Sequence, residues 1–410
     1  MRARLPFFYG WFIVAAGMAS AAFMVGTSIF GAGVFAGEMQ GELGWSRADL
    51  FGALSIRLTG GALLAPFLGA WSDRPGGARM AMVGSALLMI ASLAPLRWVD
   101  SLPAYYLVYG GVGALASAAT GGLLLGIVPK WFTRNRGKAV AAAAAGGALG
   151  PLIFPVLNAE LIAAVGWRDA WLYLGILAAV VLLPLMLLVH GTPEDIGLLP
   201  DGDSHPEPGT ATPPRWIERS YTLREVLRTR AFWLLTLAFS MGVMAMNSWQ
   251  PSWTPYLEDA GFSLRVATRS IFVFGIFSFL GRFIWAPLIK RVPLNVAVLI
   301  EMGIAAFAVS ILGLISTAPL LFAWSIVYGV AIGGFWLLQP LTLANYFGTR
   351  HLGAIRGFNQ PFIAVASGIA PISTAAIFDA TGSYAGVLIF AAVGAGVGAI
   401  LGFFAKPPQR

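Results

Sequence analysis

The sequence predicts an all-α membrane protein with twelve transmembrane helices arranged in two six-helix halves. Of its 410 residues, 58% are hydrophobic and only 11% are charged. A soluble domain is about a quarter charged, so this chain has too few charged residues to cover a surface in water. Twelve apolar segments, each close to the roughly twenty residues that a span needs, alternate with short polar turns. Lipid is therefore the expected solvent.

The apolar segments fall into two sets separated by one long polar stretch. The first six spans are expected near 9–36, 48–71, 79–98, 104–129, 139–165 and 170–190, and the second six near 231–257, 266–289, 294–315, 319–347, 354–378 and 385–404. The stretch 191–230 carries six prolines and mixed charge, which is typical of a linker. We therefore expect an N-terminal half over 1–190, a cytoplasmic linker over 191–230 and a C-terminal half over 231–410.

The distribution of basic residues predicts the orientation. With both termini and the linker on one side, that side holds 19 of the 26 lysines and arginines. The positive-inside rule then places both termini in the cytoplasm and the protein in the cell's inner (plasma) membrane. The same rule explains the net charge of +8 without a nucleic-acid partner. The chain has no cysteine and only three scattered histidines, so we expect no metal site, no cofactor and no catalytic cluster.

The turn after the second span carries a recognisable motif. It reads Gly69-Ala-Trp-Ser-Asp73-Arg74-Pro-Gly76-Gly-Ala-Arg79. This turn resembles the cytoplasmic signature of the major facilitator superfamily, although Ala78 stands where a second basic residue is often found. The resemblance implies that the motif acts as a conformational latch, in which a small residue lets two helices meet and an acid–base pair holds one state.

The fifth span contains glycines and a proline at regular steps. Gly146, Gly150 and Pro151 resemble a glycine–proline signature that antiporters of this superfamily often show, with Phe154 in place of the last glycine. The glycines permit close helix packing and Pro151 is expected to bend the helix.

Motifs throughout the chain resemble the oxalate:formate antiporter and monocarboxylate transporter branch of the superfamily. They are Tyr9-Gly10-Trp11, Pro193 to Gly202, Arg230-Ala-Phe232-Trp233, Tyr328-Gly329, Asn345 to Gly348 and Phe378 to Tyr384. The resemblance implies a secondary active transporter, not an enzyme. The resemblance further implies that the protein carries a small organic anion, most simply a monocarboxylate, by rocker-switch alternating access. A proton or an exchanged anion would be the coupled species, and a monomer in the lipid bilayer is expected.

Four charged residues lie within the predicted spans. Burying a charge in the hydrocarbon layer costs free energy, so each of the four is a candidate for a functional role. They are Arg57, Glu160, Arg282 and Glu301. In this branch, an arginine at the position of Arg282 is taken to bind the substrate carboxylate, and a guanidinium matches a carboxylate with two parallel hydrogen bonds. A structural arginine tied to helix-end carbonyls is the alternative. Ser278 stands where monocarboxylate carriers often have an aspartate, which puts proton coupling through that position in doubt.

The other three charges have less specific interpretations. Arg57 lies about 18 Å along the helix from Gly69, which places it on the periplasmic side of the membrane midplane. It could bind the substrate anion as a second cation, line an outward-facing vestibule or pair with Glu160. The oxalate carrier uses a lysine in its eleventh span, and this chain has none there, so a monocarboxylate fits better than a dicarboxylate. Glu160 is also a candidate proton relay. Glu301 is expected to reach the cytoplasmic interface and pair with Lys290 or Arg291.

Neutral side chains beside prolines complete the predicted binding site, because a proline frees a backbone carbonyl and often marks a cavity. These candidates are Asn247, Trp336, Gln339 and Asn359. A packing role is equally open for each. Rival functions are drug or sugar efflux and a non-transporting solute receptor. A cavity arginine disfavours cationic drugs.

Overall fold

The described residues form an all-helical chain. The computed structural model describes residues 8–72, 74, 76–120, 123–202, 221–289, 291–348 and 351–408, and every element there is a helix. Ten helical stretches of the described residues are long and apolar enough to cross a membrane. One of them contains two expected spans, because Gly166 breaks it with a φ of 79°. The expected span near 104–129 is interrupted at 121–122, outside the described residues. The described helices thus account for the twelve expected spans.

The chain divides into two compact units, and each contains segments from distant parts of the sequence. Unit 1 comprises residues 1–28, 56–154 and 160–215. Its helices are α1 (Gly10–Val25), α4 (Gly77–Leu93), α5 (Leu102–Tyr105), α6 (Gly113–Thr120), α7 (Leu123–Trp131) and most of α3 (Arg47–Ser72) and α8 (Arg136–Leu187). Two short π-helices, η1 (Gly26–Phe30) and η3 (Tyr106–Val112), follow α1 and α5 directly.

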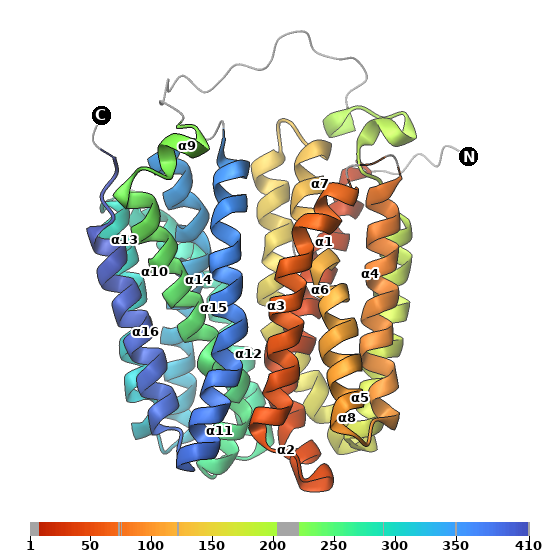
Figure 1. The fold of residues 1–410 in the computed structure, drawn as a ribbon, viewed down its shortest axis with the longest axis vertical. Coiled ribbons are helices and arrows are strands. Elements are labelled where there is room, and N and C mark those ends of the chain that lie inside the picture. The colour runs from red at the N-terminus through yellow and green to blue at the C-terminus, as the bar shows by residue number, and fades with distance from the viewer. Residues whose placement is uncertain are drawn as a thin grey trace. The chain divides into compact units, whose positions relative to one another are not determined.

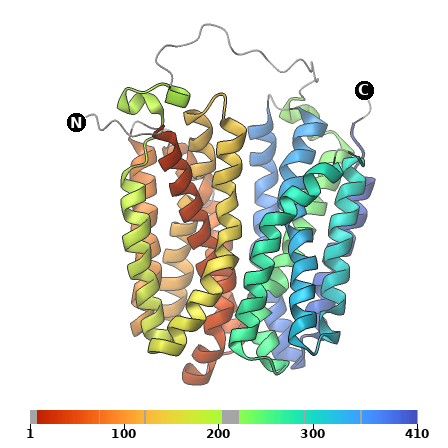
Figure 2. The ribbon, with the colours of Figure 1, turned by 180° about the vertical axis from the view of Figure 1, so that it is seen from behind.

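Unit 2 comprises residues 29–55, 155–159 and 216–410. Its helices are α2 (Gly31–Leu43), α9 (Leu223–Val226), α10 (Arg230–Trp249), α11 (Trp253–Asp259), α12 (Leu264–Ile289), α13 (Leu294–Ile311), α14 (Ala318–Phe347), α15 (Leu352–Thr381) and α16 (Ala385–Phe404). The long helices α10 and α12 to α16 run alongside one another as a bundle (Figure 1, and from behind in Figure 2). A 3-10 turn at Gln250–Ser252 separates α10 from α11.

Glycines allow the closest helix contacts. A side chain at Gly146 of α8 would collide with the backbone of Met18 in α1. In unit 2, a Cβ at Gly281 would lie 2.7 Å from the carbonyl oxygen of Val330, and one at Gly333 would lie 3.0 Å from the Cα of Gly281. Because small residues let backbones meet in lipid, α12 and α14 pack as one tight pair.

The described part of the linker is anchored within unit 1. The Oδ2 of Asp201 accepts hydrogen bonds from the backbone nitrogens of Thr133 and Arg134, both at 2.7 Å. Burial opposes ionisation of Asp201, but these hydrogen bonds and one from the Thr133 hydroxyl outweigh it and lower the pKa of the carboxyl. The segment that ends at Gly202 is therefore attached to the turn before α8.

Candidate functional site

Arg57 is the most deeply buried charged side chain among the described residues of unit 1. It lies on α3 with no exposed surface. Its Nη2 donates a hydrogen bond to the Sδ of Met89 at 3.2 Å and a long one to the Oγ1 of Thr27 at 3.5 Å. The guanidinium carbon lies 4.9 Å from the centre of the Tyr109 ring. Its Nε and Nη1 have no hydrogen-bond partner among the described residues.

Two of the residues that contact Arg57 come from π-helical segments. Thr27 belongs to η1 and Tyr109 to η3. The Tyr109 hydroxyl donates to the carbonyl of Thr27 at 3.0 Å, and the ring stacks on Tyr105 with centroids 5.3 Å apart. Gly113 provides space, because a Cβ there would lie 2.9 Å from Nη1 of Arg57. π-helical turns are rare and are often found at functional sites. The presence of two such turns around Arg57 therefore favours a functional role for this arginine.

The charge of Arg57 has no acidic counterpart within the described residues. Glu160, considered as a structural partner, is not among the contacts of Arg57 and is exposed on α8. A buried cation without a counter-charge costs several kcal/mol. Aromatic rings and a thioether offset only part of that cost. An anionic group arriving from outside the protein would satisfy the two unused donors.

Arg282 occupies the tight helix pair of unit 2. It lies half-buried on α12, one residue after Gly281. Its Nε is buried without a hydrogen-bond partner, and no ion pair to Arg282 exists among the described residues. The alternative of an arginine tied to helix-end carbonyls is therefore not observed here. Ser278, one turn before Arg282, is buried at 4% exposure and leaves the guanidinium without an adjacent carboxylate.

The neutral candidates divide into two groups. Asn247 donates to the Ser367 hydroxyl at 2.5 Å, and Asn359 donates to the Thr236 hydroxyl at 2.8 Å, so both amides tie α10 to α15. Trp336 on α14 is 45% exposed, with its ring edge-on to Phe335, and Gln339 is half-buried. Substrate contact stays a prediction for all four.

The motif after the second span is only partly described. Asp73 lies outside the described residues, and the surroundings of Gly69 are not described either. Arg74 and Arg79 are exposed, and Gly76 has a φ of 73°, a conformation that favours glycine. In the fifth span, a Cβ at Gly150 would lie 2.9 Å from Val25, while Pro151 is buried within α8. The latch and the bend remain predictions.

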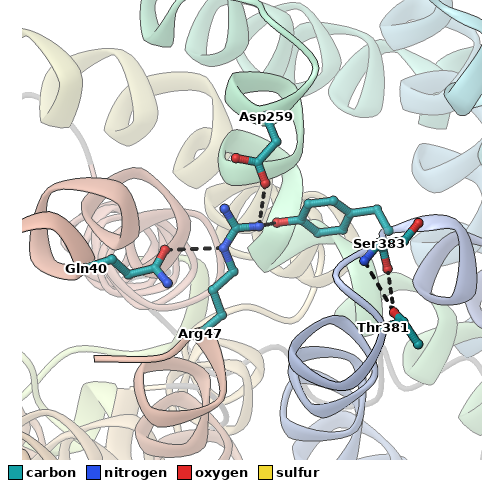
Figure 3. A network of polar contacts seen from close by, with 6 residues as sticks. Gln40, Arg47, Asp259, Thr381 and Ser383 are labelled. Carbon is teal, nitrogen blue, oxygen red and sulfur yellow. Dashed lines mark hydrogen bonds and ion pairs between the residues drawn. The ribbon is translucent and has the colours of Figure 1, made fainter. Parts of the chain in front are cut away.

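A polar network in unit 2 joins segments that are far apart in the sequence (Figure 3). Arg47, at the start of α3, forms an ion pair with Asp259 of α11 at 2.8 Å. It also donates to Gln40 Oε1 at 3.2 Å and to the Tyr384 hydroxyl. Burial raises the pKa of this hydroxyl, so Tyr384 stays neutral beside the cation. Asp379 adds an acceptor for the backbone nitrogen of Ala48 at 3.0 Å. The network therefore fastens the ends of α2 and α3 to α11, α15 and α16.

Breaking this network should make the neighbouring helix faces accessible. We expect Asp259→Asn to raise thiol labelling of a cysteine placed at Val34, which is 2% exposed and lines a cavity of about 370 Å³ beside Glu258. A partly exposed ion pair contributes up to about 1 kcal/mol, which is roughly a fivefold change in labelling rate. The chain has no native cysteine, so background labelling is absent.

The matched control removes an ion pair of similar length elsewhere. Asp169→Asn breaks the Arg97–Asp169 pair of unit 1, which spans 2.7 Å. We expect it to leave labelling at Val34 unchanged. Equal labelling of the Asp259→Asn variant and the parent would show that the network does not restrict access.

Glu301 contradicts the sequence-based expectation. It was expected at the cytoplasmic interface beside Lys290 or Arg291, but it is 1% exposed, and neither carboxylate oxygen has a hydrogen-bond partner among the described residues, which do not include Lys290. That expectation is wrong because hydropathy gives the depth of a residue and not the direction in which its side chain points. Tyr105 and Tyr109 were also missed, since aromatic residues in a span usually indicate packing alone.

Comparison with known proteins identifies the family. The sequence profile of the Major Facilitator Superfamily matches residues 18–371. The "Oxalate:formate antiporter" of Oxalobacter formigenes is 25% identical over 79% of this chain and 75% of its own length. "Monocarboxylate transporter 12" of Homo sapiens is 23% identical over 73% of this chain and 61% of its own.

A solved structure supports the fold. The "Crystal structure of D-xylose-proton symporter" superposes with a TM-score of 0.74 over 97% of this chain and 98% of the other, at 13% identity. The profile match covers most of the sequence and the helical architecture agrees with it. The chain belongs to the major facilitator superfamily.

Proposed function

We propose that this protein is a secondary active transporter of a small organic anion, with a monocarboxylate as the preferred substrate, working by alternating access. The observation that carries the proposal is the burial of Arg57 without a counter-charge among the described residues. A membrane protein keeps such a cation where function requires it. Arg282, also without an acidic partner there, is the second anion-binding group. The names of two relatives, an oxalate:formate antiporter and a monocarboxylate transporter, support an anionic substrate.

A guanidinium suits this role for two physical reasons. It stays charged after it loses water, and its planar donors match the two oxygens of a carboxylate. The carboxylate in turn loses its hydration on entry, and only a paired charge compensates for that loss. Asn359, Trp336 and Gln339 would then orient the organic part of the substrate. The charge bias of the loops supports an inner-membrane protein with cytoplasmic termini. We expect it to act as a monomer.

Uptake by proteoliposomes tests the proposal directly. We expect labelled lactate or formate to enter vesicles that contain the purified protein, and unlabelled monocarboxylates to compete with it. Labelled xylose should not enter, because an uncharged sugar leaves both guanidiniums without a counter-charge. Empty vesicles are the control. Uptake of the sugar with exclusion of every carboxylate would overturn the organic-anion assignment and favour a sugar carrier.

A further inference from the structure

A buried carboxyl group in unit 2 has a small polar environment of its own. Glu301 of α13 lines a cavity of about 10 Å³, together with apolar residues of α10, α13, α14 and α16. That volume admits about one water molecule. Both oxygens of Glu301 lack a hydrogen-bond partner among the described residues. The site therefore combines an unpartnered acid with space for a single water.

The described residues that line the cavity with Glu301 include no cation. α10 contributes Gly242, Ala245 and Met246, and α16 contributes Ala395. From α14 come Ile332, Phe335 and Tyr328. Among the residues that the structure describes, Tyr328 is the one titratable group besides Glu301 that lines the cavity. An ionised carboxylate in such surroundings is very unfavourable, so the group holds a proton in this conformation.

Tyr328 provides a donor for the ionised form. Its hydroxyl oxygen accepts hydrogen bonds from Nε1 of Trp249 at 3.0 Å and from Nε2 of Gln250 at 3.3 Å. Both lone pairs are then occupied, so the hydroxyl proton remains free to be donated. Tyr328 and Glu301 line the same cavity. The Tyr328 hydroxyl is therefore the donor in this cavity that a carboxylate formed at Glu301 could recruit.

Gln250 connects this pair to the irregular turn of the seventh span. It begins the 3-10 segment Gln250–Ser252 between α10 and α11. Broken helices in transporters line binding sites and shift between conformations. A change at this turn would move Gln250 relative to Tyr328 and alter how well the ionised form of Glu301 is stabilised.

We propose that Glu301 is the binding site for a proton that is co-transported with the anion. In the conformation described here, the carboxyl carries the proton. On release, its O–H bond breaks, the proton passes to a water molecule that enters the cavity, and the remaining carboxylate accepts a hydrogen bond from the Tyr328 hydroxyl. One proton then accompanies one monocarboxylate, so no net charge crosses the membrane. The identity of the co-transported anion rests on the proposed function, whereas the coupling to a proton rests on Glu301.

Two measurements test it in proteoliposomes and in detergent. An inward pH gradient should drive accumulation of labelled lactate in the parent, by about tenfold for each unit of pH difference. Glu301→Gln mimics the protonated group. It should lose this accumulation and keep the exchange of internal for external lactate, which needs no net proton movement. Glu194→Gln, which neutralises an exposed carboxyl of the 3-10 turn Pro193–Ile196 in the linker, is the matched control and should accumulate lactate as the parent does.

The second measurement needs no substrate, so it separates this proposal from the anion assignment. Infrared difference spectra of the purified protein should contain the carbonyl stretch of a protonated carboxyl that weakens as pH rises, and Glu301→Gln should remove it. A Glu301→Gln variant that accumulates lactate like the parent would refute the coupling role. A Glu301 band that does not respond to pH would also refute it, because a permanently neutral structural group behaves in that way.

Discussion

Replacing Arg282 by glutamine is expected to lower the affinity for the organic anion by more than a hundredfold. Removing the partner of a buried charge costs about 3–5 kcal/mol, and roughly 1.4 kcal/mol corresponds to a tenfold change in affinity. Arg282→Lys should recover only part of the binding, because an ammonium keeps the charge and loses the planar pair of donors. Equilibrium binding of lactate to purified protein is the measurement.

The control for this substitution lies on the same helix. Arg269→Gln removes the same charge from an exposed position near the start of α12, so we expect it to bind lactate as the parent does. A folded Arg282→Gln variant with unchanged lactate affinity would assign the substrate to another site, and Arg57 would be the remaining cation.

Replacing Arg57 by methionine is expected to abolish anion transport while making the protein more resistant to heat. An apolar side chain of similar length removes the cost of burying an uncompensated charge, and such replacements stabilise proteins by up to about 4 kcal/mol. The melting temperature should rise by several degrees. A structural arginine would have the opposite effect on stability. Thermal unfolding in detergent and lactate uptake in vesicles give the two readouts.

Tyr109→Phe serves as the matched variant. It retains the ring against the guanidinium and removes the hydroxyl that donates to the Thr27 carbonyl. We expect a loss of about 1 kcal/mol in stability and continued transport. If Arg57→Met lowered the melting temperature and kept lactate uptake intact, the arginine would be structural and the organic-anion proposal would rest on Arg282 alone.

The positions of the spans could be predicted from the sequence because hydropathy reports depth. The segments expected near 266–289, 294–315 and 385–404 match α12, α13 with its 3-10 extension, and α16 within two residues at each end. The break between the fifth and sixth spans was also predicted, and Gly166 provides it with a positive φ.

The rotation of each helix about its axis could not be predicted in the same way. In a helix that is apolar on all sides, the pattern does not distinguish the face toward lipid from the face toward protein. Glu301 illustrates this limit, because its place in the chain suggested an interfacial pair and its side chain points into the bundle. The π-helical turns at Gly26–Phe30 and Tyr106–Val112 were likewise missed, since their extra residue leaves no compositional mark.

The glycine contacts between α12 and α14 imply that the two helices move together, so the proposed anion site and the proposed proton site belong to one rigid pair of helices. Arg282 belongs to α12 and Tyr328 to α14, and contacts such as Gly281 against Val330 leave little freedom for one helix to move without the other. Occupancy at the guanidinium and at the carboxyl would then bias the same motion. Thermodynamic linkage makes such an effect reciprocal: the change that protonation causes in the free energy of anion binding equals the change that the anion causes in the free energy of protonation.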